Sequence, residues 1–229
     1  MTTLVLRLAG PLQAWGDSSR FNERTTRREP TKSGVVGMLA AATGRRRIDP
    51  VEDLASLRFG VRSDQQGRLI RDFQTTIDWR SGKSKPLTSR HYLGDACFVV
   101  GIEGDRALLE GLEQALRRPV YPLYLGRRSC PPVGRVVLGL REAGVEEVLR
   151  QEPWQAAEWY RRSSPVRAHL PITVDAVPGG PEDELISDNP VSFDPRDRRH
   201  SLRPVVHLDH HVDNPLGRRS TGHDPLSLL

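Results

Sequence analysis

The chain has 229 residues, a formal net charge of +5 and a hydrophobic fraction of 37%. This length is sufficient for one large domain or two small ones, and the basic balance favours an anionic partner such as nucleic acid. No apolar run approaches the roughly 20 residues that a membrane-spanning helix needs, and the two cysteines form no C-x-x-C motif, so we expect a cytoplasmic protein without a membrane partner or disulfides.

The N-terminal part begins with a strand and a capped helix. Residues 3–9 (TLVLRLA) have the Leu and Val content of a buried strand, which a Gly-Pro pair ends. A long polar loop follows. The next apolar run has helical spacing, and either Thr31 or Ser33 can cap its first turn. Gly44 then suits the end of this helix.

The middle of the chain continues with alternating strands and helices. A short helix and a strand at 58–63 precede two segments, 69–77 and 88–93, that we expect to form a hairpin with a polar tip. The later elements are a strand at 96–103, a helix at 105–118 and a strand at 135–140. Without the hairpin this is the β-α-β-β-α-β order of ferredoxin-like domains, which RNA-recognition folds also use.

After residue 142 the composition changes. An acidic helical segment at 145–160 precedes strands within LPITVDA (170–176) and PVVHLDHHV (204–212), and the region 178–203 between them is rich in Pro, Gly, Asp and Arg. We therefore predict an α+β protein with two parts. Residues 1–142 form a ferredoxin-like domain with a protruding hairpin, and residues 143–229 form a smaller, irregular, β-rich C-terminal part.

Positive charge is concentrated in three regions. Residues 20–47 contain eight Arg or Lys, residues 117–135 contain five Arg and no acid, and residues 196–203 contain four Arg. These regions either converge on one surface or form three separate solvated faces, and charge alone leaves both arrangements open.

The sequence TKSG (31–34) resembles the end of a phosphate-binding P-loop, but Thr31 stands where that motif requires glycine. Nucleoside triphosphate binding is therefore disfavoured. A helix N-terminus with Lys32 and Ser33 still predicts a phosphate site. Gly34 and Gly37 suit either a close approach of RNA backbone or tight packing of the helix.

Other motifs give weaker signals. In GPLQAWG (10–16), Gln13 offers an amide for base edges and Trp15 offers a stacking face, although Trp15 suits the core equally well. HLDHHVD (207–213) places three His and two Asp on a strand, but without a distant ligand motif a solvated strand is favoured over a metal site.

The sequence contains no G-x-S-x-G motif. A metal-independent ribonuclease can draw its acid and base from His91 with Tyr92 or from Lys83 with Lys85.

Three blocks, in order, resemble one family: LRLAGPLQAWGDSSRFNERTTRREPTKSGVVGMLAAATGRRR, YPLYLGRRSCPP and DPRDRRHSLRPVVH. They are similar to the CasD-type family of the RAMP superfamily, whose members bind the 5′ handle of the guide RNA in the type I-E CRISPR Cascade complex of antiviral defence. The resemblance implies a hairpin "thumb" at about 73–93. It also implies CRISPR RNA, backbone subunits and the large subunit as partners, with target DNA contacted only through the complex.

The resemblance further implies a non-catalytic RNA-binding subunit without a metal or cofactor. A sibling family in type I-C systems cuts RNA, so an endoribonuclease that processes CRISPR precursor RNA is the alternative. The RNA-binding residues that the resemblance implies are Gln13, Trp15, Arg20, Arg24, Lys32, Ser33, Arg90, Tyr92, Arg127, Arg128, Arg199 and Arg203.

Overall fold

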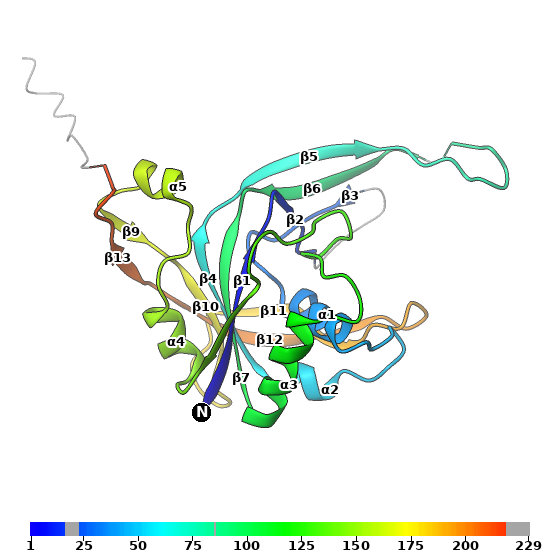
Figure 1. Ribbon diagram of the computed structural model, residues 1–229. Coiled ribbons are helices and arrows are strands. Elements are labelled where there is room, and N and C mark those ends of the chain that lie inside the picture. Colours follow the sequence, from blue (N-terminus) through cyan, green and yellow to red (C-terminus); the bar gives the residue numbers. More distant parts are fainter. Residues whose placement is uncertain (17–22, 85, 219–229) are drawn as a thin grey trace, which may run out of the picture.

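The computed structural model describes residues 1–16, 23–84 and 86–218, and its centre is one seven-stranded sheet (Figure 1). Every neighbouring pair of strands in this sheet is antiparallel. The strand order is β11 (Glu184–Ser192), β12 (Arg199–Leu208), β10 (Ile172–Asp175), β4 (Arg58–Gln65), β7 (Cys97–Gly104), β1 (Thr2–Ala9) and β8 (Val137–Arg141). The protein is therefore a mixed α/β molecule dominated by antiparallel sheet, and its C-terminal strands extend the sheet that the N-terminal strands begin. The domain division at residue 142 stays a prediction.

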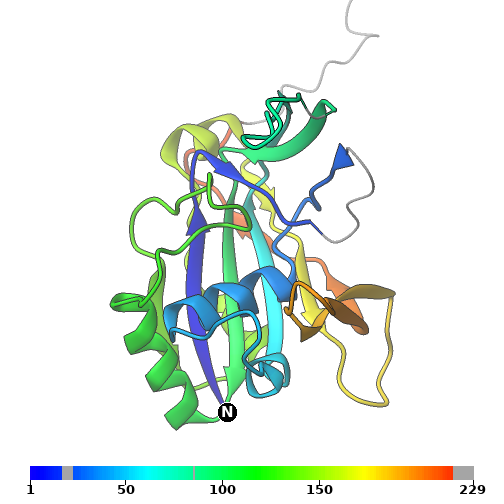
Figure 2. The ribbon, with the colours of Figure 1, turned by 90° about the vertical axis from the view of Figure 1, so that its right-hand side faces the viewer.

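One face of this sheet carries the larger hydrophobic core. Leu4, Leu6 and Leu8 of β1 point to this face, because alternate residues of a strand share a side. Figure 2 shows α1 lying across these strands. The helices that cover the face are α1 (Lys32–Ala42), α2 (Glu52–Ala55) and α3 (Arg106–Arg117).

The opposite face is covered by α4 (Val145–Gln151). Gly60 and Gly101 are paired on neighbouring strands and allow this helix to approach closely. A Cβ atom on Gly101 would lie 2.7 Å from Cγ2 of Val145, and one on Gly60 would lie 2.8 Å from Cδ1 of Leu149. RNA-recognition folds stack bases on the sheet, but here α4 already occupies that face, so a nucleic-acid site has to lie elsewhere.

A fully buried arginine fixes the C-terminal end of α4. Arg62 in β4 forms a two-pronged ion pair with Asp64. Its remaining N–H groups donate to the carbonyl oxygens of Leu149, Glu152 and Pro153. All five guanidinium hydrogens therefore have acceptors, which is the condition under which a buried charge is tolerated.

A second, smaller sheet carries the hairpin that the sequence predicts. β5 (Arg68–Gln74) pairs antiparallel with β6 (Thr88–Gly94), and β2 (Leu12–Gln13) and β3 (Glu23–Arg24) flank β6. The β5–β6 hairpin extends away from the main sheet (Figure 1) and leaves several large apolar side chains exposed. These are Leu69, Ile70, Phe73, Ile77, Trp79 and Leu87.

The C-terminal region differs from the prediction in three places. The single helix expected at 145–160 is two helices, α4 and α5 (Glu158–Ser163). The strand expected at 204–212 ends at Leu208, and His211 belongs to β13 (His211–Asp213), which pairs with β9 (Arg167–His169). The His and Asp residues of 207–213 therefore do not share one strand.

The third difference is β11, which lies within the region expected to be irregular. Its inward-facing residue Asp188 is 1% exposed. This burial of a charge is tolerated because Asp188 pairs with Arg203 of β12. A charged residue at a buried position removes the apolar alternation by which a strand is recognised in a sequence. No helix among the described residues is long and apolar enough to cross a membrane.

Candidate nucleic-acid interface

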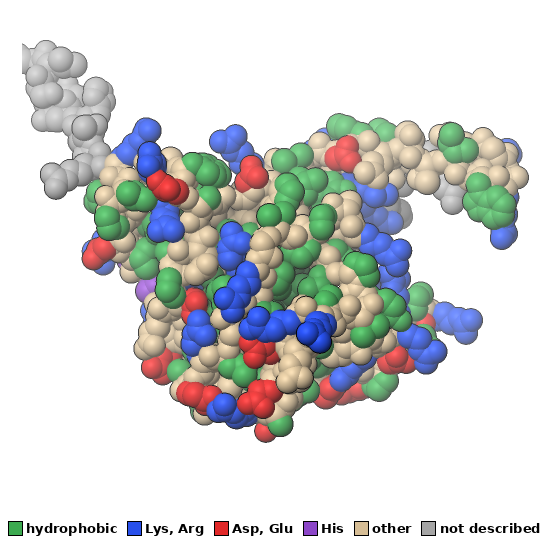
Figure 3. Space-filling model, viewed as in Figure 1, with side chains coloured by type: hydrophobic (Ala, Val, Ile, Leu, Met, Phe, Trp, Pro, Cys, Tyr) green, Lys and Arg blue, Asp and Glu red, His purple; other side chains and the backbone are tan. Residues whose placement is uncertain are grey.

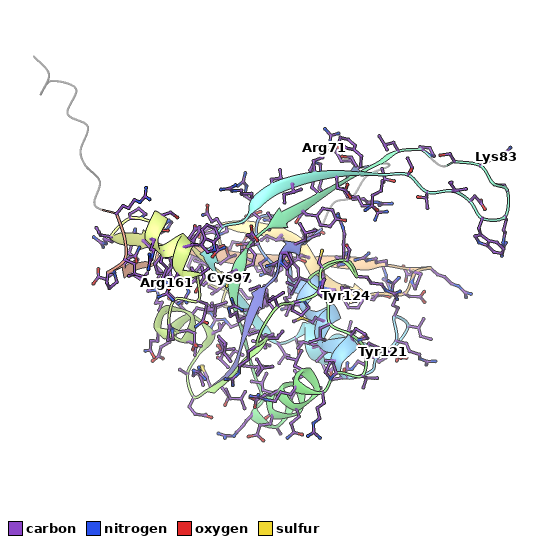
Figure 4. All side chains as sticks on the ribbon, turned by 45° about the horizontal axis from the view of Figure 1, so that its top comes forward. Arg71, Lys83, Cys97, Tyr121, Tyr124 and Arg161 are labelled. Carbon is purple, nitrogen blue, oxygen red and sulfur yellow. The ribbon has the colours of Figure 1, made fainter. Side chains whose placement is uncertain are left out.

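A groove of about 940 Å³ runs along the exposed side of α1. Its two walls are the loop 121–131, which follows α3, and the loop 193–198, which connects β11 to β12. Figure 4 shows Tyr121 and Tyr124 on the first of these loops, beside α1. The lining residues that the argument uses are Trp15, Ser33, Gly34, Gly37, Arg45, Arg46, Arg47, Tyr121, Tyr124, Arg128, Phe193 and Arg198.

Small residues of α1 form the floor of the groove. Thr31 caps the helix, and its hydroxyl oxygen accepts a hydrogen bond from the Gly34 N–H at 3.2 Å. A Cβ atom on Gly34 would lie 2.8 Å from the indole of Trp15, so this glycine is required for packing. At Gly37 the nearest atom would be Cζ of Phe193, 3.8 Å away. Without side chains at Gly34 and Gly37, α1 leaves space between the two loops that form the walls of the groove.

The wall at 121–131 is fixed by backbone hydrogen bonds at its start and near its middle. The Tyr121 N–H donates to the carbonyl of Ala41 in α1, and the Ala14 N–H donates to the carbonyl of Leu125. Gly126 adopts a φ of +82°, and a Cβ atom there would lie 1.7 Å from the Ala14 carbonyl oxygen. Only glycine fits this close approach, so the position of the wall depends on Gly126.

The lining of the groove is strongly basic. It includes five arginines and no acidic residue among the described residues. Arg45 and Arg46 are paired with Asp53 and Asp49, which lie outside the groove. The remaining three, which form no ion pair within the described part of the chain, are Arg47, Arg128 and Arg198.

The same bias appears on the surface of the molecule. Figure 3 shows Lys and Arg side chains gathered below the β5–β6 hairpin and at the outer end of β11–β12, whereas acidic side chains are frequent along the lower edge. Exposed arginines beside aromatic rings are the combination that binds single-stranded nucleic acid. The three basic regions of the sequence each contribute to the groove, through Arg45–Arg47, Arg128 and Arg198.

The phosphate role expected of Lys32 is corrected by the structure. The Lys32 ammonium lies 3.0 Å from Oδ2 of Asp175, and the Lys32 backbone N–H donates to Oδ2 of Asp188 at 2.7 Å. Arg203 binds both carboxylates. Two buried cations thus balance two buried carboxylates, and this cluster occupies the groups that a phosphate would need. Lys32 and Arg203 are structural residues that join α1 to the C-terminal strands.

Two residues of the first loop are also structural. The Gln13 side chain is fully buried, and its amide nitrogen donates to the carbonyls of Leu8 and Ala96. Its amide oxygen accepts a hydrogen bond from the indole N–H of Trp15 at 3.0 Å. Trp15 is 1% exposed, although it is among the residues that line the groove. Neither side chain is free to contact a base, which corrects the base-reading and stacking roles expected of them.

Arg127 and Tyr92 hold the second sheet to the 121–131 loop. The Arg127 guanidinium lies 4.6 Å from the centre of the Tyr92 ring and donates to the carbonyls of His91 and Arg24. Tyr92 is buried. These contacts give both residues a positioning role, and the direct RNA contacts expected of them stay a prediction.

The other predicted residues lie in several different places. Ser33 and Arg128 line the groove. Arg24 and Arg90 lie side by side, because β3 and β6 pair in that register. Arg199 is exposed beside Asp197. Arg20 lies outside the described residues.

Sequence reasoning did not single out Tyr121, Tyr124, Phe193, Arg198 or the arginines at 45–47 as site residues. For all of them except Phe193, the available signal was their position within the basic clusters or the three resembling blocks.

The geometry around the expected catalytic residues does not assemble a site. His91 Nε2 lies 4.0 Å from a carboxylate oxygen of Glu23, and the neighbouring Tyr92 is buried beneath Arg127. Lys83 lies near the far end of the hairpin (Figure 4), and Lys85 lies outside the described residues. Within the described ranges, no three His, Cys, Asp or Glu side chains are grouped so that they can hold a metal ion.

A mixed α/β fold with a basic, aromatic groove is typical of a nucleic-acid-binding protein. A model of the family described as CRISPR-associated protein (Cas_Cas5) matches residues 3–206. The chain therefore belongs to this CRISPR-associated family, and the family resemblance stated from the sequence is confirmed.

Three relatives illustrate the match. The CRISPR system Cascade subunit CasD of Escherichia coli (strain K12) is 36% identical, over 74% of this chain and 85% of that protein. The crystal structure of a Cas protein is 39% identical with a TM-score of 0.70, covering 95% of this chain and 98% of that chain. A chain of a CRISPR RNA-guided surveillance complex is 32% identical with a TM-score of 0.75, covering 98% and 96%.

Proposed function

We propose that this protein is a non-catalytic subunit of a CRISPR RNA-guided surveillance complex and that it binds the 5′ handle of the CRISPR RNA. The observation that carries this proposal is the groove along α1, which combines arginines that form no ion pair within the described residues with aromatic side chains, of which Tyr121 is exposed. The similarity to a Cascade subunit and to a chain of a surveillance complex supports it. The strand order β4-β7-β1-β8, with α1 and α3 on one face, supports the ferredoxin-like interpretation of the fold.

The groove suits single-stranded RNA better than a duplex. Its floor is the low surface of α1, and its walls present Tyr121 and Phe193, whose rings can stack on unpaired bases. Arg47, Arg128 and Arg198 can pair with the phosphates of the same strand. We assign neighbouring protein subunits, namely the backbone and large subunits, to the β5–β6 hairpin, because it leaves large apolar side chains exposed to solvent.

Removing the three unpaired arginines should weaken RNA binding and reduce its salt dependence. In the variant Arg47→Ala/Arg128→Ala/Arg198→Ala, the slope of log affinity against log salt should fall by roughly 0.7 for each phosphate that is no longer bound, or about 2 in total. Filter binding of a single-stranded repeat RNA at several salt concentrations measures this slope. The RNA should be recovered at full length in the presence of EDTA; a discrete cleavage product would contradict the non-catalytic assignment.

The matched control removes three arginines that lie on other surfaces. Arg106, Arg150 and Arg162 are each paired with a glutamate four positions away on α3, α4 and α5. Their triple alanine variant changes the net charge equally but should leave the salt slope close to the wild-type value. Equal slopes for both triple variants would refute the groove as the RNA site.

Aromatic stacking should contribute affinity without affecting the salt slope. Replacing both Tyr121 and Tyr124 by Leu should cost about 1 to 3 kcal/mol for each base that stacks on them. The control, in which both are replaced by Phe, keeps the rings and should retain affinity. If the Leu and Phe variants bind the RNA equally well, neither ring supports a base.

A further inference from the structure

A line of hydrogen-bonding side chains connects the segment ahead of α1 with the C-terminal strands. Glu29 Oε2 lies 3.0 Å from Oγ1 of Thr173 in β10, and that oxygen lies 3.1 Å from Nδ1 of His207 in β12. On its other side, His207 Nε2 lies 3.2 Å from Oε2 of Glu184 in β11. Three contacts therefore join four side chains that come from four separate parts of the chain.

The number of hydrogens in this line is one too few. Each of the three contacts needs one hydrogen between its two heavy atoms. The Thr173 hydroxyl supplies one, a neutral His207 ring supplies one, and ionised Glu29 and Glu184 supply none. All three hydrogen bonds can form together only if one more proton is bound.

We propose that Glu29, Thr173, His207 and Glu184 form a proton-dependent clasp, in which one additional proton holds residues 23–30 against the C-terminal strands. When that proton leaves, one of the three hydrogen bonds must break. The clasp would thereby act on the groove, because the Arg27 N–H donates to the carbonyl of Trp15, which lines the wall.

The charged groups around the clasp indicate where the proton resides. Glu184 is ion-paired through its second oxygen with Arg27 at 3.2 Å. Burial raises the pKa of Glu29, and the Thr173 hydrogen bond and the charges of Arg27, His207 and Arg203 offset this only in part.

The other charged group at the clasp is Asp183, whose carboxylate accepts the His207 backbone N–H at 2.8 Å. With Arg27 paired to Glu184, the additional proton belongs to the part of the line that joins Glu29, Thr173 and His207. Water has access to the His207–Glu184 end, where both side chains are nearly half exposed. We therefore assign the break on proton loss to that end.

The sign of the pH effect follows from the proton count. The unfolded chain releases the Glu29 proton at the ordinary glutamate pKa of 4.5, whereas the folded clasp retains the additional proton at higher pH. Above about pH 6.5, where a histidine of an unfolded chain is also neutral, the folded state binds one proton more than the unfolded chain, so its stability falls as the pH rises from there to the value at which the clasp releases the proton. The unfolding equilibrium constant should rise by up to about tenfold per pH unit in that range.

The variant Glu29→Gln tests the clasp directly. A glutamine amide donates a hydrogen to Thr173 permanently, so all three hydrogen bonds form with a neutral His207. Urea unfolding of the full chain, measured from about pH 7 to about pH 9, should show the one-proton slope in the wild type and its loss in the variant. The variant should also be the more stable protein at the alkaline end.

Two further variants complete the test. Glu184→Gln supplies the missing hydrogen at the opposite end and should also flatten the pH profile. Glu182→Gln, at an exposed position beside the clasp, should leave the profile unchanged. If the wild type, Glu29→Gln and Glu184→Gln have parallel pH profiles, no additional proton is bound and the clasp does not exist.

Discussion

Replacing Arg62 by Met is expected to destabilise the protein by about 3 to 5 kcal/mol, because it removes one partner of a fully buried ion pair. Asp64 would lose its counter-ion at a position without solvent access, and the carbonyls of Leu149 and Glu152 at the end of α4 would have no donor. Burial already raises the pKa of Asp64, against the opposing effect of Arg62. The midpoint of urea unfolding at neutral pH measures the effect.

Two comparisons show whether this destabilisation comes from the unpaired charge. Arg68→Met changes an exposed arginine of β5, the next strand along the chain, and should alter stability by less than about 0.5 kcal/mol. Replacing Arg62 by Met and Asp64 by Leu together removes both charges and should recover part of the stability. A double variant that is less stable than Arg62→Met would contradict this explanation.

Replacing Asp188 by Ala should also cost about 3 to 5 kcal/mol, because it leaves the buried Arg203 guanidinium with one carboxylate in place of two. The first N–H of α1, from Lys32, would be without its acceptor as well. The salt slope of RNA binding should not change, because none of these side chains carries a phosphate contact in the proposed groove. Unfolding by urea and RNA binding at several salt concentrations, measured on one preparation, separate the two effects.

The control for Asp188 is an exposed aspartate on another C-terminal strand, Asp213 of β13. Asp213→Ala removes the same charge and should be within about 0.5 kcal/mol of the wild type. Lys32→Met should behave like Asp188→Ala, with lower stability and an unchanged salt slope. A reduced salt slope in Lys32→Met would restore the phosphate role that the sequence suggests for this lysine.

Local features of the fold could be predicted from the sequence. Thr31 is the N-cap of α1, and Gly44 follows the helix with a φ of +79°, as the capping pattern indicates. The helix expected at 105–118 is α3, with the apolar residues Leu109, Leu112 and Leu116 buried on one side. These signals are local, since they depend on residues within one or two turns of each other.

The features that were missed depend on contacts between distant residues. Nothing near Lys32 in the sequence shows that Asp175 and Asp188, more than 140 positions away, neutralise it. The same contacts conceal β11, because they place charges at positions where a strand usually carries apolar side chains. Likewise, the loop at 193–198, with two Arg and two Asp, has the composition of a solvated turn, and only the fold brings Phe193 beside Gly37.

The groove along α1 also has a consequence for biosynthesis. Its lining comes from residues 14–16 near the start of the chain, from the 121–131 loop in the middle and from Arg198 close to the end. A ribosome must therefore have released the chain as far as Arg198 before the groove exists. A nascent or truncated chain would not capture an RNA, and only molecules that have completed their folding would be admitted to a ribonucleoprotein particle.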